Sequence, residues 1–254
     1  MDRNGQKFLL QGSSKKQSLS SDRMGISIHR HHGGFFLSFL FLLLMLFIGL
    51  TFVGVAGAAF QQIGFTQSEF SVILILTLLG SFVNIPLYKV RRVKRVIDYD
   101  HVRAFWITYR IPRYGLREVS TTVAINLGGA IIPILVSAYL LADHPQVWPS
   151  ALIGIVATSI VVHLVARKVE GVGIVTPALL PPIAAAVIAL LVSSTNPAVI
   201  AYVSGTLGAL IGADLTNLRG MEKFGSSMVS IGGAGTFDGV FLTGLVAVII
   251  VSIF

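Results

Sequence analysis

Long apolar runs, separated by short polar connections, fill the chain after residue 33. A helix needs about 20 predominantly apolar residues to cross the ~30 Å hydrocarbon core of a bilayer. Seven runs approach or exceed this length, and glycine or proline interrupts several of them. The pattern therefore predicts an all-α fold, a polytopic membrane helix bundle of about seven transmembrane helices. The predicted spans are residues 34–60, 70–88, 119–141, 148–166, 174–192, 197–215 and 231–254.

The composition agrees with a membrane location and excludes several kinds of chemistry. Hydrophobic residues make up 54% of the 254 residues, charged residues make up only 12%, and the mean hydropathy is +0.82. Soluble domains carry about 25% charged residues. Because the chain has no cysteine, thiol catalysis, disulfides, iron–sulfur clusters and cysteine-ligated zinc are excluded. We expect neither a metal ion nor a cofactor.

The positions of the basic residues predict an orientation. Of the 19 Lys and Arg, six precede the first span, nine lie between the second and third, two follow the fourth and two follow the sixth. With seven crossings, all of these connections lie on one face, whereas six crossings would divide them. Because cytoplasmic loops are enriched in Lys and Arg, we expect a multi-pass protein of the cell membrane with a cytoplasmic N-terminus.

The first 33 residues differ from the rest of the chain. They are polar and basic and predict a disordered cytoplasmic tail. The apolar run that follows is longer than the roughly 7–15-residue core of a signal peptide, so we interpret it as a retained first helix. His29, His31 and His32 could bind a metal, but a solvated tail beside anionic lipid explains them more simply. Residues 34–254 then form a single transmembrane domain.

A basic insertion at residues 89–118 interrupts this domain. It mixes nine Lys and Arg with aromatic residues such as Trp106 and Tyr114. Basic and aromatic residues interleaved beside a membrane are typical of an amphipathic helix on anionic headgroups. We therefore expect an interfacial helix that binds anionic lipids. Nucleic-acid binding uses the same residue types, but the segment is short, tethered at both ends and held against lipid, so we expect no nucleic-acid partner.

Two carboxylates lie where lipid is expected. Nine of the 11 acidic residues fall in tails, loops or span ends, and only Asp214 and Asp238 fall within apolar segments. Ionisable groups inside a membrane are costly and indicate functional sites. The sixth span runs toward the cytoplasm and ends at Asp214, and the seventh reaches Asp238 about two turns after leaving it. The two carboxyl groups are therefore predicted to meet in the cytoplasmic half of the membrane.

Small residues, glycines and prolines surround both aspartates. A stripe of small residues on the sixth span lets another helix approach closely. The four glycines within residues 230–239 are too many for a plain helix. Such backbone is tolerated at membrane depth only where protein or water satisfies its amides, although glycine and proline can also simply shape helix packing. The residues are Ser204, Gly208 and Gly212 in the stripe, Gly233 and Gly235 before Asp238, and Thr176, Pro177, Ala178 and Leu179 at the start of the fifth span.

A weak internal repeat draws attention to Asn84 and Asn126. Residues 79–87 align with 207–215, and residues 126–130 align with 230–234. The two hairpins share an orientation, so the repeat is parallel, and only its second copy carries the carboxylates. The aligned segments are short and glycine-rich, so chance is the competing explanation.

Residues 173–244 resemble a prokaryotic membrane-protein family catalogued as domain of unknown function 1614. The resemblance rests on residues 176–182, 205–215 and 230–244. The motifs that contain Asn84 and Asn126 extend it across most of the membrane domain. The motifs are long and specific, but the family implies no settled activity.

A looser resemblance is to presenilin-type and prepilin-peptidase-type intramembrane aspartyl proteases, which place two aspartates on membrane helices near the cytoplasmic side. Residues 233–238 are similar to their Gly-x-Gly-Asp turn, and residues 177–179 are similar to the Pro-Ala-Leu motif of the presenilin type. This chain departs from the pattern in four ways. Two residues separate the glycines from Asp238, no tyrosine precedes Asp214, the Pro-Ala-Leu motif comes before the aspartates, and seven spans replace nine.

Two activities and one non-catalytic role fit this sequence. In a protease-like enzyme, Asp214 and Asp238 share one proton, so that one activates water while the other polarises the scissile carbonyl of a membrane-embedded peptide. In an ion- or proton-coupled transporter, the interrupted helices bind a small solute and an aspartate carries the ion. The third reading is a scaffold whose basic insertion binds lipid or a partner. The residues expected to contact substrate are Thr176, Pro177, Ala178, Leu179, Gly233, Gly235, Asn84 and Asn126.

Overall fold

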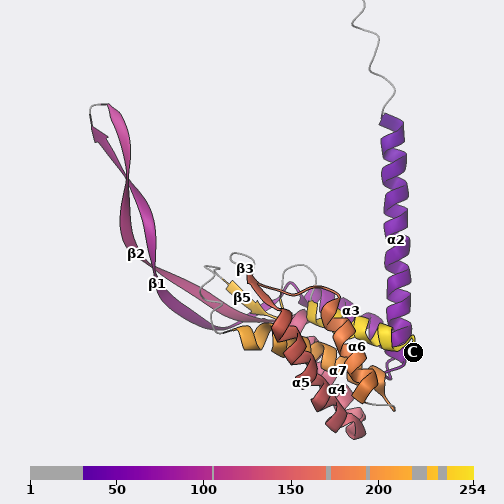
Figure 1. Ribbon diagram of the computed structural model, residues 1–254. Helices are drawn as coiled ribbons and strands as arrows, with labels where there is room; N and C mark the ends of the chain where they lie inside the picture. The colour runs from indigo at the N-terminus through magenta and orange to yellow at the C-terminus, as the bar shows by residue number, and fades with distance from the viewer. Residues whose placement is uncertain (1–30, 105, 170–172, 193–194, 219–227, 234–238) are drawn as a thin grey trace, which may run out of the picture. The chain divides into compact units, whose positions relative to one another are not determined.

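The computed structural model describes residues 31–254 except 105, 170–172, 193–194, 219–227 and 234–238. The chain divides into two compact units, Met1–Phe52 and Val53–Phe254. Within the described part, helices alternate with five strands (Figure 1). The predicted tail at residues 1–33 falls almost wholly outside the described residues.

The described part of the first unit, residues 31–52, belongs to a single helix. Helix α2 (His31–Gln61) coincides with the first predicted span. Its segment Leu37–Gln61 is apolar on every side, and large side chains such as Phe41 and Phe47 are exposed. A helix that is apolar all round suits a lipid environment better than water.

Six further α-helices belong to the second unit. Three helical segments of the described chain, counting α2, are long and apolar enough to cross a membrane: Leu37–Gln61, Pro145–Val165 and Pro197–Asn217. This is consistent with a membrane protein. The six helices are α3 (Gln67–Gly80), α4 (Ile132–Asp143), α5 (Trp148–Val165), α6 (Leu180–Val192), α7 (Pro197–Ala209) and α8 (Gly239–Val251).

Four short helical turns extend three of these helices, α4, α5 and α7. Two are π-helical, η1 (Leu127–Ile131) before α4 and η3 (Leu210–Asp214) after α7. Single π-helical turns frequently occur at functional sites. Two are 3₁₀ turns, η2 (Pro145–Val147) before α5 and η4 (Leu215–Asn217) after η3. The four remaining apolar helices, at 67–80, 127–143, 180–192 and 239–251, are shorter than a full span.

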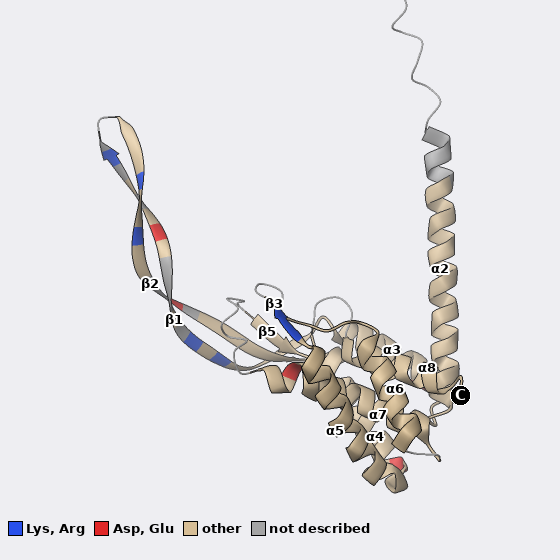
Figure 2. Cartoon of the chain, viewed as in Figure 1, with Lys and Arg blue, Asp and Glu red and all other residues tan. Residues whose placement is uncertain are grey.

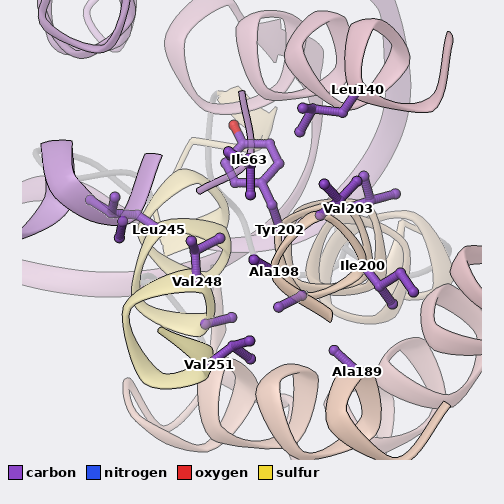
Figure 3. Packing of buried hydrophobic residues seen from close by; sticks show 14 of the residues in the cluster. Ile63, Leu140, Ala189, Ala198, Ile200, Tyr202, Val203, Leu245, Val248 and Val251 are labelled. Carbon is purple, nitrogen blue, oxygen red and sulfur yellow. The ribbon is translucent and has the colours of Figure 1, made fainter. Parts of the chain in front are cut away.

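Helix α7 lies at the centre of the second unit. Helices α4, α5, α6 and α8 all pack against it, and Tyr202 lies fully buried among Ile63, Leu140 and Leu245 (Figure 3). The predicted small-residue stripe on α7 and η3 is confirmed as a close-approach surface, and its partner is α5. A Cβ added at Gly208 would lie 2.7 Å from the Cβ of Thr158, so only glycine allows the observed approach.

A long hairpin replaces the interfacial helix expected at residues 89–118. Strands β1 (Asn84–Ala104) and β2 (Ile107–Asn126) pair antiparallel along their whole length, from Asn84 opposite Asn126 to Ala104 opposite Ile107. The all-α prediction is therefore wrong here. The segment is rich in Val, Ile and Tyr, which favour strands, and Pro112 opposes a continuous helix.

The hairpin has two differently surrounded parts. We call residues 84–88 and 121–126 the hairpin base, and residues 89–104 and 107–120 the hairpin arm. At the base, a third strand, β5 (Met228–Ile231), pairs in parallel with β2, with Ala124 opposite Ser230. The helices predicted over 70–88 and 119–141 are therefore too long, because residues 84–88 and 119–126 are strand. A buried strand and a buried helix are equally apolar, so the apolar runs in the sequence do not show where the helix ends and the strand begins.

A second, small hairpin connects α5 to α6. Strand β3 (Arg167–Val169) pairs antiparallel with β4 (Gly173–Val175). Within the described chain, every Lys and Arg lies on β1, β2 or β3 (Figure 2). The basic residues therefore belong to the strands, while helices α3 to α8 contain neither Lys nor Arg.

Candidate functional site

Asn126 organises the polar contacts at the hairpin base. It is the last residue of β2, and only 2% of it is exposed. Its Nδ2 donates to the carbonyl of Ser81 at 2.7 Å and to Oδ1 of Asn84 at 3.1 Å. Its Oδ1 accepts the N–H of Gly129 at 2.7 Å and so caps η1. A buried amide with these three bonds fixes where the strand ends and the helix begins.

Ser230 brings the end of the chain into this network. It lies on β5, and its hydroxyl donates to the same Oδ1 of Asn84 that accepts from Asn126. The side chains of Asn84, Asn126 and Ser230 thus join β1, β2 and β5. Two of the three, Asn84 and Asn126, are predicted site residues, and the structure brings them together.

Asp214 reaches the same region from η3. Its Oδ2 accepts the backbone N–H of Gly232 at 2.6 Å. Gly232 follows β5 directly, and its φ of +74° is a left-handed conformation that favours glycine. A Cβ added there would lie 2.6 Å from the backbone carbon of Gly129. This residue therefore needs glycine both for its dihedral angle and for the close approach to η1.

These groups form one site, which we call the polar junction: Asn84, Asn126, Asp214, Ser230 and Gly232. Ser230 and Gly232 are two residues apart, and Gly232 packs against Gly129, whose N–H Asn126 binds. An apolar cluster adjoins the junction and contains Ala130, Leu210, Ile231 and Val240. The junction thus places a carboxylate, two amides and a hydroxyl where the strands meet the helices.

The other predicted residue beside the junction is Gly233. Its N–H donates to the carbonyl of Ser230 at 3.4 Å, and an added Cβ would lie 2.6 Å from the hydroxyl of Ser230. Gly235 and Asp238 lie outside the described residues. The predicted meeting of the Asp214 and Asp238 carboxyl groups therefore stays a prediction.

The segment from Thr176 to Leu179 lies between β4 and α6. Thr176 and Pro177 line a cavity together with Arg167, whereas Ala178 and Leu179 are exposed. Strand β4 lies beside η3, the turn that ends at Asp214. In the described contacts, none of the four residues bonds to Asp214.

Sequence reasoning missed two members of the polar junction. Ser230 falls in the internal repeat opposite Asn126, so the repeat contained a usable signal. Gly232 belongs to the glycine-rich segment, but glycine count alone does not reveal which glycine has a positive φ. No group of three His, Asp or Glu that could hold a metal ion occurs among the residues the structure describes.

The sequence of the chain matches one protein family. A family model described as protein of unknown function DUF1614 matches residues 78–250, which is more than half of the chain. The matched range includes every residue of the polar junction. No curated protein and no solved structure matches the chain. The chain therefore belongs to the family described as protein of unknown function DUF1614.

Proposed function

We propose that the chain is a multi-pass protein of the cell membrane with seven spans and a cytoplasmic N-terminus. The connectivity supports this arrangement. All strand-containing connections leave α3, α5 or η3 and return to α4, α6 or α8, and these are the connections that the charge pattern places in the cytoplasm. Helices shorter than a full span are compatible with seven crossings if buried strand segments complete the crossing. Non-helical backbone is tolerated at membrane depth when protein surrounds it.

Cysteine labelling tests this topology. A cysteine at exposed Gln146 should react with an impermeant reagent from outside intact cells, and a cysteine at exposed Arg91 should react only after the membrane is opened. The reverse pattern would contradict the proposed orientation. Labelling of both sites from outside would contradict an odd number of crossings between them.

For the chemistry, we infer a protease-like enzyme in which Asp214 and Asp238 form the catalytic dyad. The observation that supports it is that the chain is fixed near Asp214 on both sides of Asp238. On one side Gly232 donates to Asp214, and on the other Val240 packs in one apolar cluster with Leu210. Asp238 lies outside the described residues and stands two positions before Val240 in the sequence.

The contact with Gly232 assigns different roles to the two oxygens of Asp214. A backbone N–H only donates, so Oδ2 is held as an acceptor. Oδ1 then faces the reaction, where it takes a proton from water that attacks the peptide carbonyl. Protonated Asp238 donates to the carbonyl oxygen, and the amine leaves with a proton returned by the dyad. Asn84, Asn126 and Ser230 position β5 and hence Gly232.

Reporter cleavage tests the dyad. Asp214→Asn and Asp238→Asn should each reduce cleavage of a membrane-embedded peptide reporter by about 10³-fold, because each removes a group that transfers a proton. Asp143→Asn removes a carboxylate whose side chain is 57% exposed beside His144, and it should retain full cleavage. Retained cleavage in either dyad variant would exclude this mechanism.

A second candidate, an ion- or proton-coupled transporter, is favoured by a different observation. The segments that follow β2 and β5 lie against each other at Gly129 and Gly232, so the two copies of the repeat meet at their breaks. Paired interrupted helices are typical binding sites of transporters. In proteoliposomes, Asp214→Asn should abolish ion-coupled uptake while Asp214→Glu retains part of it. A dyad protease would lose activity in both variants.

We also propose that the hairpin arm contacts anionic lipid. The 16 residues that β1 contributes to the arm extend about 50 Å, and the arm carries nine Lys and Arg against three acidic residues. Trp106 at its tip is 98% exposed and Tyr114 is 78% exposed. Exposed aromatic and basic side chains suit the headgroup layer, and an isolated two-stranded hairpin is marginally stable without further contacts.

A further inference from the structure

A cavity of about 590 Å³ lies between the end of α5, the β3–β4 hairpin and the beginning of α6. Six apolar side chains, the hydroxyl of Thr176 and Arg167 line it. This volume falls within the range of about 300–1,000 Å³ that is usual for small-molecule sites. The cavity is apolar along most of its wall, and its lining includes one cationic side chain, Arg167.

The register of the small hairpin explains which basic residue faces the cavity. Arg167 pairs with Val175 and Val169 pairs with Gly173, so these side chains share one face of the hairpin. Lys168 pairs with Ile174 and belongs to the opposite face. The lining accordingly includes Arg167, Val169 and Val175. Arg167 and Lys168 are therefore adjacent cations of equal charge with different surroundings.

The cavity also lies at a particular depth. The span-length segment Pro145–Val165 ends two residues before Arg167. Given the membrane placement proposed above, on which this inference rests, Arg167 lies at the boundary between hydrocarbon and headgroups. The apolar wall formed by Leu164, Val165 and Leu180 then extends from that boundary into the hydrocarbon.

We propose that this cavity binds one anionic phospholipid. The guanidinium of Arg167 binds the phosphate, and an acyl chain lies along Val175, Pro177 and Leu180. Arginine is suited to this role because its planar donors bind phosphate oxygens bidentately. Basic pockets between transmembrane helices on the cytoplasmic side bind lipid headgroups in the same way. A soluble anion would leave the apolar wall unused, and a neutral lipid would offer Arg167 no counter-charge, which the described lining residues also lack.

Native mass spectrometry of the full chain in detergent tests the site, with phosphatidylglycerol titrated into the protein. The wild type should retain one phosphatidylglycerol in preference to phosphatidylcholine. Arg167→Gln should weaken this binding about tenfold, the effect of losing one charge-assisted contact, and Arg167→Lys should lie between. Lys168→Gln is the matched control, because it removes the same charge from the opposite face, and it should change the affinity by less than about twofold.

Three results would overturn the proposal. Equal weakening by Arg167→Gln and Lys168→Gln would show a diffuse charge effect. Equal retention of phosphatidylcholine would remove the role of the anionic headgroup. Displacement of the lipid by glycerol phosphate would show that the headgroup alone binds. A thermal unfolding curve for each variant separates lost binding from lost folding, and Arg167→Lys keeps the test decisive if Arg167→Gln fails to fold. The assay measures neither cleavage nor uptake, so its failure and the failure of the proposed chemistry are distinguishable.

Discussion

The base and the arm of the long hairpin consist of the same two strands in different surroundings. At the base, β2 has a partner strand on both edges, and Val123, Ala124 and Asn126 are buried. In the arm, β1 and β2 pair with no other described strand, and side chains are exposed on both faces, for example Tyr99 at 55% and Tyr109 at 51%. The comparison teaches that strand pairing alone does not stabilise the arm, whereas packing and buried hydrogen bonds stabilise the base.

The largest expected effect is that of Gly232→Ala at the base. Alanine at a φ of +74° is strained, and its Cβ would lie 2.6 Å from the backbone of Gly129. The two effects together should cost about 3 kcal/mol, measured as a lower free energy of unfolding in detergent. Gly115→Ala in the arm is the matched control, because nothing lies within 4 Å of its added Cβ. Equal destabilisation by both changes would contradict the contrast between base and arm.

Asn126→Ala should have the next largest effect. It removes three hydrogen bonds and leaves the Gly129 N–H and the Asn84 Oδ1 with fewer partners. We expect a loss of about 2 kcal/mol in thermal or denaturant unfolding. The control is Thr108→Ala, an exposed position in the arm, which should change stability by less than about 0.5 kcal/mol. A neutral Asn126→Ala would mean that the network does not hold the base together.

Substitutions in the arm should change its binding to lipid and not the stability of the protein. In a Trp148→Phe background, Trp106 is the only tryptophan, and brominated anionic lipid in nanodiscs should quench it. Arg110→Gln should reduce the bound fraction of the arm about fivefold, since one basic residue contributes about 1 kcal/mol near an anionic surface. Asp98→Asn provides a control of opposite sign and should strengthen the contact. If neither Arg110→Gln nor Asp98→Asn changed the quenching, an electrostatic contact of the arm with lipid would be excluded.

The smallest expected effect is a gain in stability at the arm's tip. Trp106 has a φ of +67°, which costs a residue other than glycine roughly 1 kcal/mol. Trp106→Gly should therefore slow hydrogen exchange of the neighbouring arm amides by up to about fivefold. Trp106→Ala removes the indole but keeps the unfavourable dihedral angle, so it should show no such slowing. Equal protection in both variants would show that the indole, not the backbone, sets the stability of the tip.

The sequence predicts the helices of this fold better than its strands. The apolar runs at α2, at α5 and at α7 with the turns η3 and η4 that extend it are long and uniform, so their positions agree with the structure to within a few residues. Residues 119–126 are equally apolar, but they pair with two strands, and pairing partners distant in sequence leave no periodic signal. In the arm, the basic residues suggested a lipid-bound helix, while the β-branched and aromatic residues determined the backbone.

The candidate site is predicted in part, for a similar reason. The internal repeat indicates Asn84 and Asn126, whose contact depends on local capping and on one antiparallel pair. The bond between Asp214 and Gly232 depends on a parallel pair between strands more than a hundred residues apart, which the pattern of residues does not specify. The position of Thr176 and Pro177 beside Arg167 depends on the β3–β4 hairpin, which is too short to have a recognisable pattern.

The parallel pairing of β2 with β5 also determines when the polar junction can form during synthesis. Residues 122–125 can pair with β5 only after residues 228–231 have emerged from the ribosome. Until then, one edge of β2 at the base has unpaired N–H and C=O groups, which would be costly at the membrane depth that we propose for the base. The nascent chain therefore needs a temporary partner along this edge. Asp214 gains its contact with Gly232 only after residue 232 is translated, so a chain truncated before that residue cannot assemble the junction.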